Sequence, residues 1–167
     1  FSSPDAVLSG KRVEIGRQAS ERLMEKERFM NRLTFRLLWD SARHQSRRVA
    51  ESVQIKNIFL RRLLHRDRIS NDGVWGCNFS LYKELFIAIN GSDEDFLDGS
   101  IEDNDIGIRI LNLGKRLRSV RGLAIVFHLW HSSTWSFDNE KYKYNAAILK
   151  RRIENKETVC KNGIRKL

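Results

Sequence analysis

Apolar and polar positions change from an alternating to a helical pattern early in the chain. Val13 and Ile15 lie on one face of a stretch closed by glycines, which predicts a short strand over 9–16. Over 18–68 no glycine or proline occurs and apolar residues recur at helical spacing, so this stretch is predicted to be helical. The polar run 43–48 predicts a break within it.

Two apolar stripes define the helices expected in this stretch. The first consists of Leu23, Met24, Phe29, Met30, Leu33, Phe35, Leu37 and Leu38, continued by Trp39. The second consists of Ile55, Ile58, Phe59, Leu60, Leu63 and Leu64. Because arginines are interleaved with the stripes, the simplest interpretation is a helical hairpin that packs its apolar face on the domain and leaves its arginines in solvent.

The rest of the chain alternates strands and helices, separated by turn signals. The predicted elements are a strand over 74–79, helices over 81–89 and 101–111, a buried strand over 123–127 and a closing basic helix over 144–155. Ser80 is the expected N-cap of the helix over 81–89, and Asn90–Gly91 its expected end. An acidic loop is expected over 92–100. This alternation is typical of an α/β fold.

Composition indicates a soluble globular chain. With 167 residues, 41% of them hydrophobic, the chain can form one domain with a sizeable core. No apolar run reaches the length of about 20 residues that a membrane span needs, and Phe1–Gly10 lacks the pattern of a signal peptide. Cys77 and Cys160 have no metal-ligand spacing, so free thiols in a reducing cytoplasm are expected, with a single disulfide as the alternative.

The positive charge is concentrated in the helical stretch. Residues 11–68 hold 16 Lys and Arg against 7 Asp and Glu, which is +9 of the net charge of +10. Such a surplus suits nucleic acid, an anionic membrane surface or an anionic substrate. No zinc-finger spacing or aromatic RNA-binding motif accompanies it, so nucleic acid is the less favoured partner. Solvated arginines remain the simplest interpretation, and an anionic membrane surface is the main alternative.

Three acids begin the helix predicted over 101–111. Glu102, Asp103 and Asp105 would be stabilised in the ionised form by the helix N-terminus. An ionised carboxylate can accept a proton from a sugar hydroxyl or hold a substrate through its hydroxyls. Acids at this position also commonly only cap a helix, and without further signals that interpretation is preferred.

Two histidines follow the strand predicted over 123–127. His128 and His131 lie where open α/β sheets place their ligands, and neutral imidazole is a common ligand of divalent metals. The spacing alone is weak, because one or both rings could form hydrogen bonds in a core. Asn78, with Gly76 before it, would let a substrate approach the backbone closely.

Taken together, these motifs resemble glycosyltransferase family 2. The resemblance rests on the motifs 76–80 (GCNFS), 90–94 (NGSDE), 99–103 (GSIED) and 124–131 (AIVFHLWH). It is strongest to the branch whose C-terminal half is similar to the galactosyltransferase C-terminal domain. The segments 9–16, 145–149 and 163–166 also resemble segments of such enzymes, so the likeness covers nearly the whole chain.

The resemblance implies a role for each motif residue. Asp103 would be the catalytic base of an inverting, single-displacement transfer, and Glu102 would orient the acceptor or donor sugar. His128 would bind a divalent metal, manganese or magnesium, that bridges the donor diphosphate. His131 would contact the diphosphate or be a second ligand. The residues expected to line the sugar pocket or to stack on sugar rings are Gly76, Asn78, Asp93, Trp75 and Trp130, although an aromatic residue at a strand end is more often part of a core.

Two departures from the family pattern affect these expectations. Gly99-Ser-Ile stands before Glu102 where relatives commonly have Trp-Gly-Gly. No Asp-X-Asp motif follows an upstream strand, since Asp103-Asn-Asp105 lies on the helix, and no N-terminal βαβ unit is present. Residues 1–167 are therefore expected to be the C-terminal, acceptor-and-metal portion of a GT-A fold, a mixed sheet flanked by helices, with 18–68 as a basic helical insertion.

The expected function is transfer of a sugar from a nucleotide-sugar donor to a hydroxyl of a glycan, a lipid-linked glycan or a protein. Such an enzyme would work in the cytoplasm, with the basic helices suited to the inner face of the membrane, and the isolated piece is expected to be inactive. The alternative is a non-catalytic module whose basic helices bind nucleic acid or a protein. An enzyme descendant that has lost activity is a third interpretation.

Overall fold

The fold was analysed in a computed structural model, which describes residues 3–25, 46–68, 73–98, 100–132 and 139–167. The chain forms two compact units. Unit 1 contains Phe1–Ser9, Arg68–Ser119 and Thr134–Leu167, and unit 2 contains Gly10–Asp67 and Val120–Ser133. The predicted insertion over 18–68 thus falls in unit 2 up to residue 67, and its origin as an insertion into a longer enzyme stays a prediction.

Unit 1 is built around a mixed three-stranded sheet in the order β3-β1-β4. The strands are β1 (Ala6–Ser9), β3 (Phe79–Ser80) and β4 (Arg116–Ser119). The central strand β1 pairs antiparallel with β3 and parallel with β4, in a register that places Ala6 opposite Arg116 and Ser9 opposite Ser119. Three of the four residues of β1 are buried, as expected for a central strand with neighbours on both sides.

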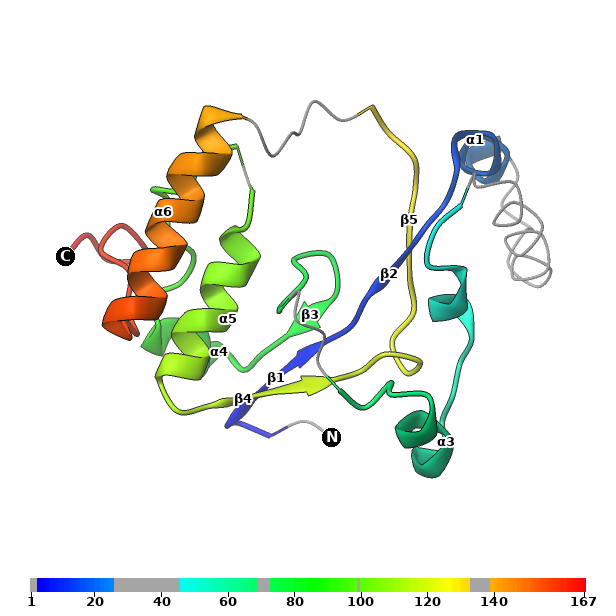
Figure 1. The fold of residues 1–167 in the computed structure, drawn as a ribbon, viewed down its shortest axis with the longest axis horizontal. Coiled ribbons are helices and arrows are strands. Elements are labelled where there is room, and N and C mark those ends of the chain that lie inside the picture. The colour runs from blue at the N-terminus through cyan, green and yellow to red at the C-terminus, as the bar shows by residue number, and fades with distance from the viewer. Residues whose placement is uncertain (1–2, 26–45, 69–72, 99, 133–138) are drawn as a thin grey trace. The chain divides into compact units, whose positions relative to one another are not determined.

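Three helices complete unit 1, and Figure 1 shows α5 and α6 side by side. They are α4 (Lys83–Ala88), α5 (Glu102–Asn112) and α6 (Glu140–Asn155). The buried core consists of Val7, Val74, Leu85, Ile89, Ile106 and Ile110. Gly107 lets α5 approach the chain at Val74, since a Cβ at position 107 would lie 2.9 Å from Val74 Cγ2. The predicted α/β class is therefore confirmed as helices with small sheets, one of them mixed.

Unit 2 contains a two-stranded parallel sheet and short helices. Its elements are β2 (Arg12–Glu14), α1 (Arg17–Glu25), the 3-10 helix η2 (Val49–Ser52), α3 (Ile58–Leu63) and β5 (Val126–His128). The register of β2 and β5 places Val13 opposite Phe127 and Glu14 opposite His128. Val13, Ile15 and Val49 form the core. Among the described residues, no helix has both the length and the apolar character needed to cross a membrane.

The helices of unit 1 confirm the predictions made from periodicity. The helices predicted over 81–89, 101–111 and 144–155 correspond to α4, α5 and α6, with ends that differ from the predicted ones. The largest difference is the start of α6, which begins at Glu140. Asn90 and Gly91 end α4 with φ angles of 64° and 77°, as expected for a left-handed helix stop. The described part of the acidic loop over 92–100 contains neither helix nor strand.

Several strand boundaries were predicted wrongly. Residues 74–78 form a turn instead of a strand, with the Asn78 amide donating to the Trp75 carbonyl at 2.9 Å, and only Phe79–Ser80 is extended. Ser80 is not the N-cap of α4, because that position belongs to Tyr82, whose side chain caps nothing. Of the strand predicted over 9–16, only Arg12–Glu14 forms β2, and Ser9 is instead the last residue of β1. The strand predicted over 123–127 is the half-buried β5, which includes His128.

The helical stretch over 18–68 is shorter and more broken than predicted. Its described part contains α1, η2 and α3, and Ser46–Arg48 is non-helical as expected for the break. Most of the first apolar stripe, like 43–45, lies outside the described residues. The second stripe is not buried: apart from Ile55, its members are exposed on α3, whereas Arg61 is only 1% exposed. The prediction of a buried stripe with solvated arginines is thus wrong for α3.

Candidate functional site: the start of α5 and the histidine pair

The start of α5 is held against the turn that contains Gly76. Asp103 accepts two backbone hydrogen bonds, from the Gly76 amide to Oδ2 at 2.7 Å and from the Asn104 amide to Oδ1 at 2.8 Å. A Cβ at position 76 would lie 3.3 Å from Asp103 Oδ2, so glycine gives this carboxylate room. The structure therefore brings together Asp103 and the turn that carries Trp75, Gly76 and Asn78.

Glu102 is a half-buried carboxyl beside Asp103 at the first position of α5. Burial raises the pKa of Glu102, and the negative charge of Asp103 raises it further, although a backbone hydrogen bond acts in the opposite direction. Its Oε2 atom is buried and has no hydrogen-bond partner within the described parts of the chain. An acidic group with a raised pKa and an unused oxygen can form a hydrogen bond to a sugar hydroxyl.

Asp93 and Asp105 serve the interior of unit 1. Both carboxylates form buried ion pairs with Arg152 of α6, and Asp105 also pairs with Arg109 at 2.8 Å. The side chains of all four residues, the two aspartates and the two arginines, are at most 2% exposed. This network joins α5, α6 and the acidic loop. The role of Asp93 in a sugar pocket stays a prediction, but the structure gives its carboxylate a structural partner.

The two predicted metal ligands lie in unit 2 with their rings facing each other. His128 Nε2 and His131 Nε2 are 3.2 Å apart, and the ring planes are inclined at 71°. The Nδ1 atom of His131 lies 3.0 Å from the Ser132 carbonyl, and the tautomer that donates this bond leaves the Nε2 lone pair toward His128. Burial lowers the pKa of His128, as do the charges of Arg12 and His131, while Glu14 acts in the opposite direction. Neutral imidazole is the form that binds metals.

The separation of the two Nε2 atoms fits a hydrogen bond between the rings, and it is also compatible with two ligands of one ion. Two nitrogen atoms at about 2.0–2.2 Å from a metal in adjacent positions lie about 3–3.4 Å apart. The observed separation of 3.2 Å falls in this range. No group of three or more His, Cys, Asp or Glu side chains that could hold a metal occurs in the described segments, so the pair alone can supply only part of a coordination shell.

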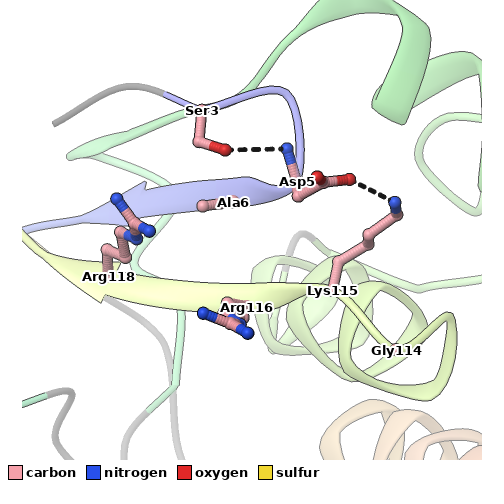
Figure 2. Close-up of a pocket in the computed structure, with 7 residues that line it drawn as sticks. All are labelled: Ser3, Asp5, Ala6, Gly114, Lys115, Arg116 and Arg118. Atoms are coloured by element: carbon pink, nitrogen blue, oxygen red, sulfur yellow. Dashed lines mark hydrogen bonds and ion pairs between the residues drawn. The ribbon is translucent and has the colours of Figure 1, made fainter.

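A polar cavity of about 370 Å³ lies elsewhere in unit 1, between the start of β1 and β4 (Figure 2). It is lined by Ser3, Asp5, Ala6, Gly114, Lys115, Arg116 and Arg118. Asp5 pairs with Lys115 across it, and the hydrogen bond and charge of Lys115 lower the pKa of Asp5. No residue predicted for the site lines this cavity. The alternation of arginines along β4 is the sequence signal that could have indicated it.

One comparison with known proteins supports a relationship to glycosyltransferases. Residues 64–132 match a family model described as the N-terminal domain of galactosyltransferase. No curated protein and no solved structure matches the chain. The matched stretch is similar to a galactosyltransferase domain and covers less than half of the chain. This supports the galactosyltransferase part of the resemblance for that stretch, and the assignment to glycosyltransferase family 2 stays a prediction. The motifs suggested the C-terminal domain of such enzymes, whereas the matching description names the N-terminal one.

The match contains every residue predicted for the site. The turn at Gly76, the acids at the start of α5 and the histidine pair all lie within 64–132. Galactosyltransferases are hexosyltransferases that use a sugar donor and an acceptor. The match therefore supports a relationship between the stretch that contains these residues and such enzymes. Trp75, Gly76, Asn78 and the acids belong to unit 1, and the two histidines belong to unit 2.

Replacing Arg152 tests the network behind α5. Arg152→Ala would leave the buried carboxylates of Asp93 and Asp105 without their shared cation, so we expect the free energy of unfolding to fall by about 3–5 kcal/mol. The neighbouring Arg151 is exposed and pairs with Glu157 at the surface, so Arg151→Ala should cost at most about 1 kcal/mol. Urea unfolding followed by circular dichroism measures both, and equal losses would contradict a structural role for the network.

The charge environment of His128 predicts its titration. Because burial and nearby cations favour the neutral ring, the imidazole should titrate below the usual histidine pKa of 6.5 in NMR spectra recorded against pH. Glu14→Gln removes the one nearby charge that favours protonation and should lower the midpoint further. Glu21→Gln, an exposed acid paired with Arg17 on α1, is the matched control and should leave the midpoint unchanged. A midpoint above 6.5 in the unmodified chain would refute this description.

Proposed function

We propose that this chain supplies the acceptor side of an inverting glycosyltransferase, with Asp103 as catalytic base. The observation that carries the proposal is the Asp103 carboxylate, oriented by backbone amides at a helix start within the galactosyltransferase-related stretch. The substrates proposed are a nucleotide-sugar donor and a hydroxyl of a glycan, a lipid-linked glycan or a protein. Enzyme action in the cytoplasm is part of the same proposal.

The environment of Asp103 suits a base. Two backbone amides hold the carboxylate in one orientation at the start of α5, so its oxygens keep a fixed position relative to a bound hydroxyl. Each carboxylate oxygen can accept more than one hydrogen bond, so both can still receive a hydroxyl. In the proposed step, Asp103 takes the proton of the acceptor hydroxyl while that oxygen attacks the anomeric carbon. The bond from that carbon to the nucleoside diphosphate breaks at the same time, which inverts the configuration.

Glu102 is proposed to position the sugar hydroxyl that reacts. Glu102 is half-buried, and its buried Oε2 has no partner among the residues described, so turning the carboxyl outward to a substrate hydroxyl would break no hydrogen bond of that atom within those residues. Trp75, Asn78 and the exposed Gly76 backbone remain candidates for sugar contacts at the same turn.

The histidine pair is proposed to bind manganese or magnesium. When bound, such a metal stabilises the negative charge of a departing diphosphate. His128 and His131 would each contribute Nε2, and the Ser132 carbonyl would orient the ring of His131. Because no group of three or more metal-ligating side chains occurs among the described residues, the remaining ligands and the nucleotide site are proposed to come from outside the described ranges. The natural protein that contains this chain is therefore the form to assay.

The role of Asp103 is tested by replacing its charge while keeping its shape. Asp103→Asn in the natural protein should lower kcat by about a hundredfold or more, because the amide cannot take up the hydroxyl proton. The assay follows consumption of a panel of nucleotide sugars with Mn²⁺. Asp98→Asn, an exposed acid paired with Lys141, is the matched control and should retain activity. Full activity of Asp103→Asn would remove Asp103 as the base, and no consumption of any donor by the unmodified protein would count against the transferase itself.

Metal binding by His128 and His131 can be measured without a nucleotide-sugar donor. Mn²⁺ titrated into the protein should lose its free-ion signal in electron paramagnetic resonance, and His128→Ala or His131→Ala should restore most of that signal. Binding should also weaken as the pH falls through the titration of His128, because protonated imidazole cannot ligate a metal. The exposed His65 of unit 2 gives the control, His65→Asn. Unchanged binding in both histidine variants would exclude this pair as the site.

A further inference from the structure

Helix α3 presents an apolar surface to solvent. Ile58, Phe59, Leu60, Leu63 and Leu64 are all exposed, and we call this set the α3 face. Phe59 and Leu63 are each 74% exposed. Single exposed apolar residues are common on soluble proteins, but five within seven consecutive positions form a contiguous patch that is typical of an interaction site.

Buried arginines fix the direction of this face. Arg61 is 1% exposed and donates through Nε to the Arg121 carbonyl at 3.4 Å. Successive helical residues are rotated by about 100°, so Phe59 and Leu63, two positions before and after Arg61, point away from it. Burial of Arg61 therefore places the two most exposed side chains outward. The apolar exposure is thus a consequence of how α3 is attached to unit 2.

A second set of contacts holds the ends of α3. Arg66 pairs with the buried Glu51 at 2.8 Å and donates to the Ala50 carbonyl at 2.7 Å. Glu51 also pairs with Arg121, and the Ile55 amide donates to the Gly122 carbonyl at 2.8 Å. At its other end, Asn57 caps α3 by accepting hydrogen bonds from two backbone amides. A rotation that hid the apolar side chains would have to break these contacts.

The charges around the α3 face identify the kind of partner. Lys56 and Arg62 are exposed next to it, and Asp67 is the one acid between residues 53 and 68. A partner must therefore offer both an apolar interior and negative charge. The boundary between acyl chains and anionic headgroups offers both. Nucleic acid would match the cations but gives exposed leucine side chains no apolar surface of comparable extent.

We propose that the α3 face docks on an anionic lipid bilayer. Phe59 and Leu63 insert at the boundary between headgroups and acyl chains, and Lys56 and Arg62 contact the negatively charged headgroups. This is attachment to one leaflet, consistent with a described chain that has no helix able to span a bilayer. The inference is independent of the proposed transferase activity, because no residue of the α3 face has a role in the proposed chemistry.

Vesicle binding tests the proposal directly. The 167-residue chain is sedimented with vesicles of phosphatidylcholine alone and of phosphatidylcholine containing phosphatidylglycerol. We expect binding to the anionic vesicles that weakens as salt is raised, and a loss of about tenfold or more in the double variant Phe59→Ser, Leu63→Ser. Ile153→Ser is the matched control, because Ile153 is an exposed apolar residue on α6 of unit 1, 51% exposed, and it should bind as the unmodified chain does.

A second variant keeps the test decisive if the double variant unfolds, as judged by circular dichroism. Arg62→Glu reverses an exposed charge on α3 without adding or removing a core contact and should also weaken binding to anionic vesicles. The proposal is overturned if the unmodified chain binds neither kind of vesicle, or if the folded double variant binds as well as the control. It is equally overturned if the chain does not bind vesicles but forms dimers that the double variant abolishes. The α3 face would then join two copies of the chain. Binding to a DNA duplex in place of vesicles would also overturn it.

Discussion

The shared pairing of Arg152 with Asp93 and Asp105 is the interaction on which unit 1 most depends. A buried carboxylate is strongly unfavourable without a cation, and here one guanidinium serves two carboxylates from different segments. Arg109 adds a second cation to Asp105 within α5. The network therefore joins α6, the acidic loop and α5 more specifically than apolar packing could, because each charged group requires its partner in one position.

This network also separates the roles of the acids that begin α5. Asp103 and Asp105 are two residues apart, so their side chains leave the helix about 200° apart. Asp105 points into the interior toward Arg109 and Arg152, and this leaves Asp103 directed to the Gly76 turn. The structural interpretation is thus supported for Asp105, whereas the chemical role of Asp103 stays a proposal. Asp105 stabilises the fold, and Asp103 remains available at a turn with an exposed backbone.

The sequence predicted those parts of the fold whose signals are local. Helix α5 was found because apolar periodicity, acids at its start and a glycine stop at Gly114 agree. Strand β4 was not predicted because Arg116 and Arg118 give its sequence the pattern of a polar loop. Its partner β1 also lies more than a hundred residues earlier in the chain, so no local signal indicates the pairing. Likewise, the acids and Gly76 could be nominated from their motifs. The hydrogen bond that joins Asp103 to Gly76 leaves no pattern in the sequence.

The burial of arginine explains why the prediction of a buried apolar stripe with solvated arginines is wrong for α3. A count of residues 11–68 treats every arginine as surface charge, yet Arg61 and Arg66 are buried, Arg66 with Glu51. Arginine can be buried because its fork of donors satisfies carbonyls and carboxylates together, and once it is inside, neighbouring apolar residues on a short helix must face outward. The α3 face is consequently defined less by the net charge of residues 11–68 than by the apolar side chains that face solvent because the arginines are buried. At α3 this leaves the exposed cations Lys56 and Arg62 beside an apolar centre, a combination that net charge alone could not reveal.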